Sequence, residues 1–154
     1  MGESNLRAFE AGDFEALCKI DRACFPRGIA YSRRMMGDLL AMPQADCIVA
    51  ESKTSICAFI ITLADAREGH IITLDVLLEY RRARLGTRLL EVAEARLAAR
   101  GIRSISLEAS VENAPAVAFW RNHGYCEERL LKDYYRNGQD AWSMAKRLPE
   151  KKGS

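Results

Sequence analysis

Hydrophobic and polar residues alternate along this chain in two patterns, one with the period of a β-strand and one with the period of an α-helix. Short apolar or alternating runs predict strands at residues 6–9, 47–51, 56–64, 71–77, 102–109, 125–131 and 141–148. Apolar residues at helical spacing predict helices at residues 13–24, 32–42, 87–100 and 113–123. This order predicts a single α/β (α+β) domain over residues 1–154, with its core at about 6–148. We expect a central mixed, mostly antiparallel sheet with helices on both faces.

Local signals support these boundaries. Asp13, Ser32 and Asn113 stand where a short polar side chain caps the start of a helix. Gly101 follows the third helix at a position that favours glycine, because the chain often turns left-handed there. Residues 52–54 are expected to form the turn of an antiparallel hairpin.

The segment at residues 73–90 is the most informative part of the chain. A strand-like apolar run ends in a turn that contains Arg81, Arg82 and Arg84, and a helical pattern follows directly. The first turn of a helix leaves backbone N–H groups unpaired and attracts phosphate, and the arginines add positive charge. The segment therefore predicts an anion site, although it lacks the glycine patterns of P-loops and of dinucleotide-binding folds. The alternative is a solvated basic turn between a strand and a surface helix.

Composition narrows the range of functions. A net charge of +2 over 154 residues gives no reason to expect a nucleic-acid partner. Because no apolar run has transmembrane length and no signal-peptide pattern begins the chain, we expect a cytoplasmic protein without a membrane partner. The five cysteines lack C-x-x-C spacing and are expected to be reduced thiols. With two histidines and no Cys/His cluster, no metal site is expected.

Four segments, in the same order, resemble motifs of the GCN5-related N-acetyltransferase (GNAT) superfamily. Residues 81–86 resemble its acetyl-CoA loop, R/Q-x-x-G-x-G/A, except at Arg84. Residues 107–125 resemble a strand with an acidic residue, followed by a helix of the pattern N-A-x-A-x-x-L/F-Y-x-x-x-G-F/Y. Residues 25–32 and 134–141 are similar to the F-P-x-x-x-Y/W-S and Y-Y-x-x-G-x-D-A segments of RimI-type enzymes, which acetylate protein N-termini.

This resemblance implies the GNAT fold, acetyl-CoA as cosubstrate and no metal. Backbone N–H groups of residues 82–87 would hold the pyrophosphate, Val76 would hydrogen-bond the pantetheine amides, and Asn113 would contact the cofactor near its thioester. The residues that the resemblance assigns to the cofactor are Leu74, Asp75, Val76, Arg81, Arg82, Ala83, Arg84, Leu85, Gly86, Thr87 and Asn113.

Two residues depart from the family pattern. Arg84 occupies the place of the first loop glycine, where a side chain obstructs close backbone approach and unusual φ and ψ angles. We expect weaker or repositioned cofactor binding, with phosphate pairing by the guanidinium as compensation. Trp120 occupies the place of the tyrosine that protonates the leaving thiolate, and an indole N–H is not a usable general acid. Water, Tyr80 or Tyr134 would then supply the proton, and Trp120 is alternatively an apolar filler beside Phe119.

The resemblance places the catalytic base at Glu108, which would deprotonate the acceptor amine through water. An α-amino group has an intrinsic pKa of about 8, so little help is needed at neutral pH. The alternative for Glu108 is a solvated carboxylate on a polar strand face. Tyr80 matches a position that some N-terminal acetyltransferases use in catalysis, with packing as its alternative. His70 precedes a strand with no evident partner and receives no role.

The predicted function is acetyl-CoA-dependent N-acetylation of a protein N-terminal α-amine. The side chains expected to line the peptide groove are Phe25, Tyr31, Tyr134 and Tyr135. The tyrosines are alternatively core or rim residues. Two other functions stay open: acetylation of a small amine such as a polyamine, amino acid or antibiotic, and a catalytically impaired CoA- or peptide-binding module. The second is motivated by Arg84 and Trp120 together, and the sequence indicates no oligomeric state.

Overall fold

The computed structural model describes residues 4–53 and 55–149 and contains a seven-stranded sheet in the order β1-β2-β3-β4-β5-β7-β6. The strands are β1 (Asn5–Ala8), β2 (Ala45–Ser52), β3 (Ser55–Asp65), β4 (Glu68–Val76), β5 (Ser104–Ser110), β6 (Cys126–Leu131) and β7 (Ala141–Arg147). The helices are α1 (Phe14–Cys24), α2 (Arg33–Ala41), α3 (Leu85–Ala99) and α4 (Ala114–Asn122), with 3-10 helices η1 (Ala11–Asp13) and η2 (Leu78–Ala83). Neighbouring strands are antiparallel except β4 and β5, which confirms the predicted mixed, mostly antiparallel sheet.

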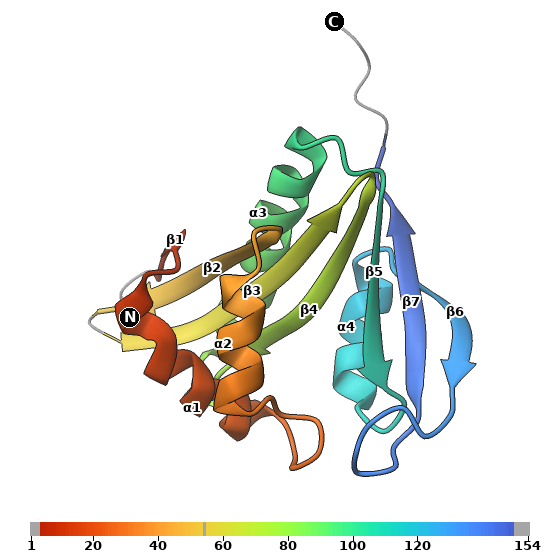
Figure 1. Cartoon of the computed structure of the whole chain (residues 1–154), viewed down its shortest axis with the longest axis horizontal. Coiled ribbons are helices and arrows are strands. Elements are labelled where there is room, and N and C mark those ends of the chain that lie inside the picture. The colour runs from red at the N-terminus through yellow and green to blue at the C-terminus, as the bar shows by residue number, and fades with distance from the viewer. Residues whose placement is uncertain (1–3, 54, 150–154) are drawn as a thin grey trace, which may run out of the picture.

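Helices cover both faces of this sheet, as the hydrophobic pattern predicts. Figure 1 shows α1 and α2 on one face and α3 and α4 on the other. Side chains that alternate along each strand enter one of two clusters. Val49 packs with Leu17 of α1 and Met36 of α2, whereas its neighbour Ile48 packs with Leu89 of α3. Strand burial on both faces explains the nearly continuous apolar runs in the middle of the sequence.

The sheet opens between its two central strands. The parallel pairing of β4 and β5 runs only from Glu68 opposite Ser104 to His70 opposite Ser106. Beyond that point the strands diverge (Figure 1). On the other side of β4, the pairing with β3 passes from Thr73 directly to Ile71, so Ile72 is the extra residue of a β-bulge. A bulge bends its strand, and this one lies where β4 leaves β5.

Three predicted helix boundaries are confirmed by their hydrogen bonds or backbone angles. The Ser32 hydroxyl accepts from the Met35 N–H at 3.1 Å, and the Asn113 side chain accepts from the Ala116 N–H at 3.2 Å. Gly101 follows α3 with a φ of 88°. The hairpin between β2 and β3 is also confirmed, although Thr54 of its turn lies outside the described residues.

The predicted capping role of Asp13 is wrong. Its carboxylate accepts the Glu10 N–H at 2.8 Å and pairs with the Arg7 guanidinium at 2.8 and 2.9 Å. Both carboxylate oxygens of Asp13 are therefore occupied, by the bidentate contact with Arg7 and by the N–H of Glu10. Asp13 therefore closes η1 and fastens it to β1, and makes no side-chain cap on α1.

The expectation that a helix follows the basic turn directly is confirmed, and the turn itself contains a short 3-10 helix. Residues Leu78–Ala83 form the 3-10 helix η2, which separates β4 from α3. Arg84 then adopts the left-handed conformation, with φ 59° and ψ 27°, and α3 begins at the next residue. Because Arg84 has a positive φ, it interrupts the helical conformation and separates η2 from α3.

Candidate active site

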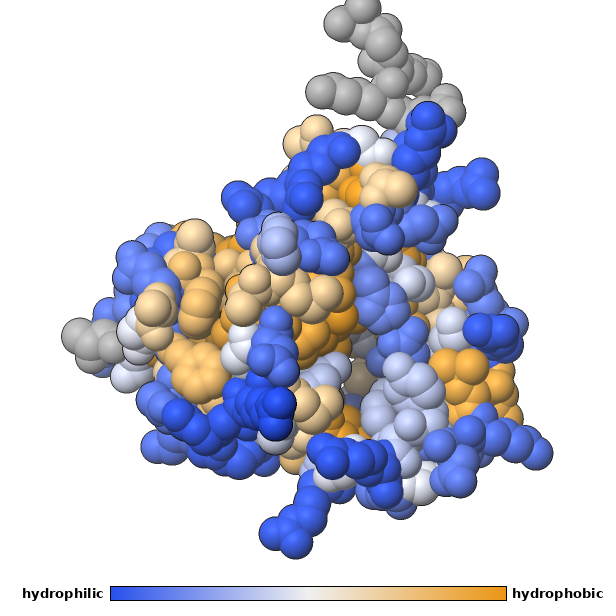
Figure 2. Space-filling model, viewed as in Figure 1, coloured by the Kyte–Doolittle hydropathy of each residue, from blue (hydrophilic) through white to orange (hydrophobic). Residues whose placement is uncertain are grey.

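Two adjoining cavities lie where β4 and β5 diverge. The first, of about 320 Å³, is here named the tyrosine cavity because Tyr31, Tyr134 and Tyr135 line it. The second, of about 350 Å³, is named the arginine cavity because Arg81 and Arg84 line it. Figure 2 shows a hollow between the two halves of the molecule on the face that carries α1 and α2. The residues that line both cavities are Phe25, Leu74, Asn113, Ala116 and Trp120.

A hydrogen-bonded group of side chains surrounds Glu108 in the tyrosine cavity. Oε1 of Glu108 lies 2.9 Å from Nε2 of His70 and 3.3 Å from the Tyr134 hydroxyl, which donates to it. The other ring nitrogen of His70, Nδ1, lies 2.7 Å from the Ser106 hydroxyl. Because an ionised carboxylate only accepts hydrogen bonds, Nε2 carries the hydrogen in the contact with Glu108. Glu108 is thus held by two donors on Oε1, and its side chain is 21% exposed.

Strand pairing brings His70 to Glu108. His70 stands opposite Ser106 in the β4–β5 pair, and Glu108 follows two residues later on the same face of β5. Ile105 and Leu107 belong to the core cluster, and Glu108 of the predicted polar alternation lines the tyrosine cavity. Sequence reasoning missed His70, because its partners become visible only when the register of two strands distant in sequence is known.

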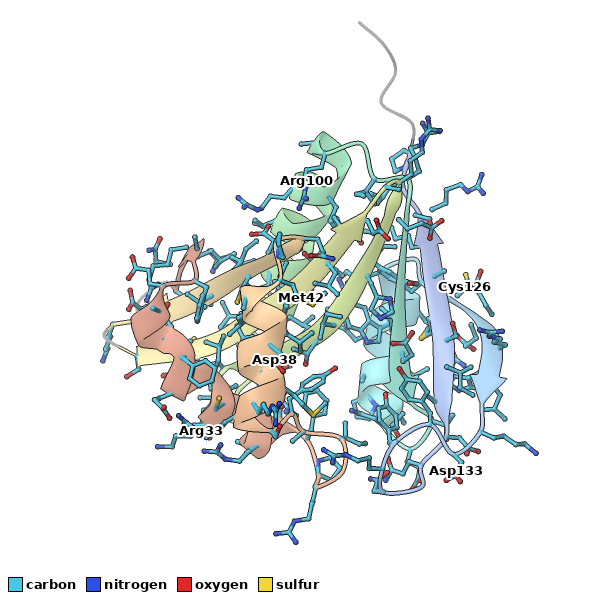
Figure 3. The ribbon with its side chains drawn as sticks, in the orientation of Figure 1. Arg33, Asp38, Met42, Arg100, Cys126 and Asp133 are labelled. Atoms are coloured by element: carbon cyan, nitrogen blue, oxygen red, sulfur yellow. The ribbon has the colours of Figure 1, made fainter. Side chains whose placement is uncertain are left out.

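Two loops form the outer wall of the tyrosine cavity and meet each other. One joins α1 to α2, and the other joins β6 to β7. A Cβ atom added to Gly28 would stand 2.8 Å from both Cβ and the backbone N of Asn137, so the loops touch there. The Ser110 hydroxyl donates to the Gln139 side chain at 2.6 Å, which fastens the second loop to β5. Figure 3 shows Asp133 of this second loop at the end of the molecule away from Arg100.

The arginine cavity lies at the start of α3. Arg81 donates from Nε to the Val76 carbonyl at 3.0 Å, and Arg84 occupies the left-handed position just before the helix. Thr87 lies in the first turn, with its hydroxyl 3.1 Å from Nε2 of His123. Gly86 lets the Phe119 ring pack close to the helix, since an added Cβ would lie 3.3 Å from that ring. Unpaired helix N–H groups together with two arginines suit a pyrophosphate, so these residues fit the phosphate end of acetyl-CoA.

Trp120 stands at the junction of the two cavities. It is 7% exposed, packs edge-on against Phe119 with ring centroids 5.1 Å apart, and contacts Tyr125 in the same way at 5.4 Å. Trp120 is therefore a core residue that also borders both cavities, and its relation to thiolate protonation stays a prediction.

Burial keeps the phenols and the thiol of the site protonated at neutral pH. Burial raises the pKa of Tyr31 to about 12 and that of Cys24 to about 11. The pKa of Tyr135 is raised by burial and then by the charge of neighbouring Tyr134 and Glu108. Burial and the contact with Glu108 raise the pKa of Tyr134 as well. These phenols consequently act as hydrogen-bond donors.

The structure brings most of the predicted site residues to the two cavities. Those that line the tyrosine cavity are Phe25, Tyr31, Leu74, Glu108, Asn113, Trp120, Tyr134 and Tyr135. Those of the remaining set that line the arginine cavity are Val76, Arg81, Arg84, Gly86 and Thr87. The ones that line neither are Asp75, Tyr80, Arg82, Ala83 and Leu85. Tyr80 packs against the core instead, and the backbone contacts expected of residues 82–85 stay a prediction.

The described residues contain neither a metal-binding cluster nor a membrane-spanning helix. Across residues 4–53 and 55–149, no group of three or more His, Cys, Asp or Glu side chains is placed to hold a metal ion. In the same ranges no helix is long and apolar enough to cross a membrane.

The chain is similar to known proteins in sequence and in structure. The model of the acetyltransferase (GNAT) family matches residues 14–125. The chain is 32% identical to an uncharacterized N-acetyltransferase of Methanocaldococcus jannaschii, over 96% of this chain and 94% of that protein. It is 27% identical to the N-alpha-acetyltransferase of Sulfurisphaera tokodaii, over 93% of this chain and 92% of the relative.

Solved structures share the fold. The ribosomal-protein-S18-alanine N-acetyltransferase from Escherichia coli superposes with a TM-score of 0.86 at 24% identity, covering 98% of this chain and 97% of that one. Ard1 from Thermoplasma volcanium gives a TM-score of 0.89 at 22% identity, covering 97% of this chain and 100% of that one.

Proposed function

The chain belongs to the acetyltransferase (GNAT) family, and from this premise we propose that it transfers the acetyl group of acetyl-CoA to the α-amine of a protein N-terminus. The observation that carries the proposal is the position of Glu108. His70 and Tyr134 hold Glu108 in the tyrosine cavity, which adjoins the arginine cavity at Trp120. Relatives named N-alpha-acetyltransferase support the same acceptor class.

Acetyl-CoA supplies an activated acyl group on a thiol leaving group. The start of α3 would bind its pyrophosphate through the backbone N–H groups near Arg84, Gly86 and Thr87, with the guanidinium of Arg84 close by. Leu74 and Asn113 border both cavities, so they would direct the acyl end into the tyrosine cavity. The Val76 carbonyl accepts from Arg81 and from the Cys24 thiol. The N–H of Val76 would hydrogen-bond the pantetheine arm.

Glu108 is the proposed base. Both of the hydrogen bonds seen at its carboxylate in the described residues fall on Oε1, so Oε2 remains to receive a proton from the acceptor ammonium, directly or through water. His70 and Tyr134 orient the carboxylate by donating hydrogen bonds to it. Ser106 in turn fixes the ring of His70.

Loss of the thiolate requires little from the protein. Trp120 can donate a hydrogen bond near the departing sulfur but cannot release its indole proton, so we propose that water protonates the thiolate. Tyr80 lines neither cavity, and the hydroxyl of Tyr134 is engaged with Glu108.

A thiol-release assay tests this function. Purified protein is supplied with acetyl-CoA and a panel of N-terminal peptides, free amino acids and polyamines, and mass spectrometry locates the acetyl group. We expect turnover with peptides, acetylated on the α-amine, and a fall in kcat of about 10²-fold or more in Glu108→Gln. Preference for free amines over peptides would contradict the proposed acceptor class. Full activity of Glu108→Gln would contradict the proposed base.

A further inference from the structure

Two carboxyl groups meet behind the wall of the tyrosine cavity, outside the groups used above. Asp21 on α1 is 0% exposed and Asp75 on β4 is 1% exposed. The bulge at Ile72 turns Asp75 toward α1, so that its side chain lies within hydrogen-bonding reach of Asp21. Such deeply buried acids require an explanation, because burial of charge without compensation is costly.

The hydrogen bonds of this pair leave one atom unpaired on each partner. Oδ2 of Asp21 accepts the backbone N–H of Tyr31 at 2.7 Å, and Oδ1 of Asp75 accepts the Thr73 hydroxyl. The two remaining oxygens, Oδ1 of Asp21 and Oδ2 of Asp75, are buried with no donor among the described residues. A single proton shared between these two oxygens would give each of them a hydrogen-bond partner. It would also remove one of the two charges, and adjacent buried carboxylates cannot both ionise.

One shared proton would thus link two walls of the site. Thr73 donates to Asp75, Tyr31 donates its N–H to Asp21, and a protonated Asp75 would donate to Asp21 between them. Thr73 and Tyr31 both line the tyrosine cavity, on β4 and on the α1–α2 loop respectively. Burial, followed by the contact with Asp21, raises the pKa of Asp75 well above its ordinary value, in agreement with the shared proton.

We propose that the proton-sharing pair Asp21–Asp75 is a positioning device that holds the α1–α2 loop against β4 and thereby sets the acceptor-binding wall at Tyr31. This inference rests on the proposed function only for the identity of the acceptor. Neither carboxyl group lines either of the two cavities, so the Asp75 side chain is not placed for the cofactor contact that the family resemblance assigns to this residue.

Two variants of the pair give different outcomes. Asn at position 75 still accepts from Thr73 and donates an N–H to Asp21, so Asp75→Asn preserves the link. Ala at position 21 has no side-chain acceptor. Asp21→Ala therefore leaves both the Tyr31 N–H and the Asp75 proton without a partner.

The experiment compares both variants with wild type in steady-state kinetics and in amide hydrogen exchange. We expect Asp21→Ala to raise the KM for the acceptor about tenfold, with the KM for acetyl-CoA unchanged. The Tyr31 amide should exchange at least about tenfold faster in this variant. Asp75→Asn should retain the wild-type acceptor KM and the protection of the Tyr31 amide.

Several results would overturn the proposal. They are an unchanged acceptor KM in a folded Asp21→Ala protein, and equal loss of acceptor and donor binding in both variants. Should Asp21→Ala not fold, Asp75→Asn still decides, because unprotected exchange at Tyr31 there refutes the link. Hydrogen exchange needs no acceptor, so the positioning role can fail or hold separately from the choice of peptide as substrate.

Discussion

At the scale of single residues, Arg84 shows what the family pattern avoids. Its φ of 59° lies in the left-handed region, where an L-residue with a side chain is strained by about 1–2 kcal/mol. The sequence predicts this conflict, because glycine is expected there. In the structure Arg84 adopts this strained conformation, and it lines the arginine cavity.

Replacing this arginine by glycine should stabilise the protein. Arg84→Gly removes the strain but adds about 0.5–1 kcal/mol of backbone entropy to the unfolded chain, so a net gain of about 0.5–1 kcal/mol remains. Denaturant unfolding without donor measures it. Arg82→Gly, at an exposed position in η2 with no positive φ, is the matched control and should lose stability. A loss in both variants would show that position 84 is not strained.

The second residue-scale prediction concerns Trp120. Trp120→Tyr brings a phenol to the junction of the cavities and should raise kcat about tenfold if protonation of the thiolate limits turnover. Trp120→Phe leaves the same space without a hydroxyl and separates the chemical effect from the loss of packing against Phe119 and Tyr125. An unchanged or lower rate in the tyrosine variant would refute this assignment of position 120.

At the scale of elements, the acceptor side depends on two loops that meet at Gly28 and Asn137. A Cβ at Gly28 would clash with the Asn137 backbone at 2.8 Å, and the φ of 95° at Gly28 is itself unfavourable for other residues. The contact closes the outer wall above Tyr31 and Tyr135. The two loops are therefore one functional unit, although about a hundred residues separate them in the sequence.

Gly28→Ala should separate the loops and weaken acceptor binding. We expect the acceptor KM to rise about tenfold, with the KM for acetyl-CoA unchanged, because small displacements of positioning groups have large effects. Gly101→Ala is the matched control, since its φ of 88° is equally strained but nothing lies within 4 Å of the added Cβ. The same acceptor KM in both variants would mean that the loop contact does not shape the site.

The elements themselves were predictable from the sequence, because alternation and capping signals are local. Ser32, Asn113 and Gly101 act as their residue types predict. Asp13 does not, because a nearby arginine from β1 competes for its carboxylate. The bulge at Ile72 and the pairing of His70 with Glu108 were not predictable, since both depend on the register between strands distant in sequence.

At the scale of the whole molecule, the sheet has two halves that are joined by a short parallel pairing between β4 and β5. The fold class and the order of elements follow from the sequence, because each element buries its own apolar face. The Asp21–Asp75 pair does not, since two separate aspartates in a sequence give no sign that they meet. It links α1 to the central strand and so contributes to the stability of the entire fold.

This buried pair makes the free energy of unfolding depend on pH. Burial and the contact with Asp21 raise the pKa of Asp75 above its ordinary value of 3.8, so the folded protein still holds this proton at pH values at which the unfolded chain has lost it. The contribution of this proton to stability is fully present below about pH 4 and is lost as the pH rises through the raised pKa. Other groups that face the pair are Arg81, Cys18, Cys24, Tyr31 and Cys47.

Asp75→Asn should abolish this dependence, because asparagine cannot ionise and still donates to Asp21. Denaturant unfolding at about pH 5 and about pH 9 should show the variant gaining on wild type as the pH rises. The control is Asp38→Asn, which removes an exposed carboxylate on α2 (Figure 3) and should follow the wild-type curve. A constant difference between Asp75→Asn and wild type would show that no proton is taken up at this pair on folding.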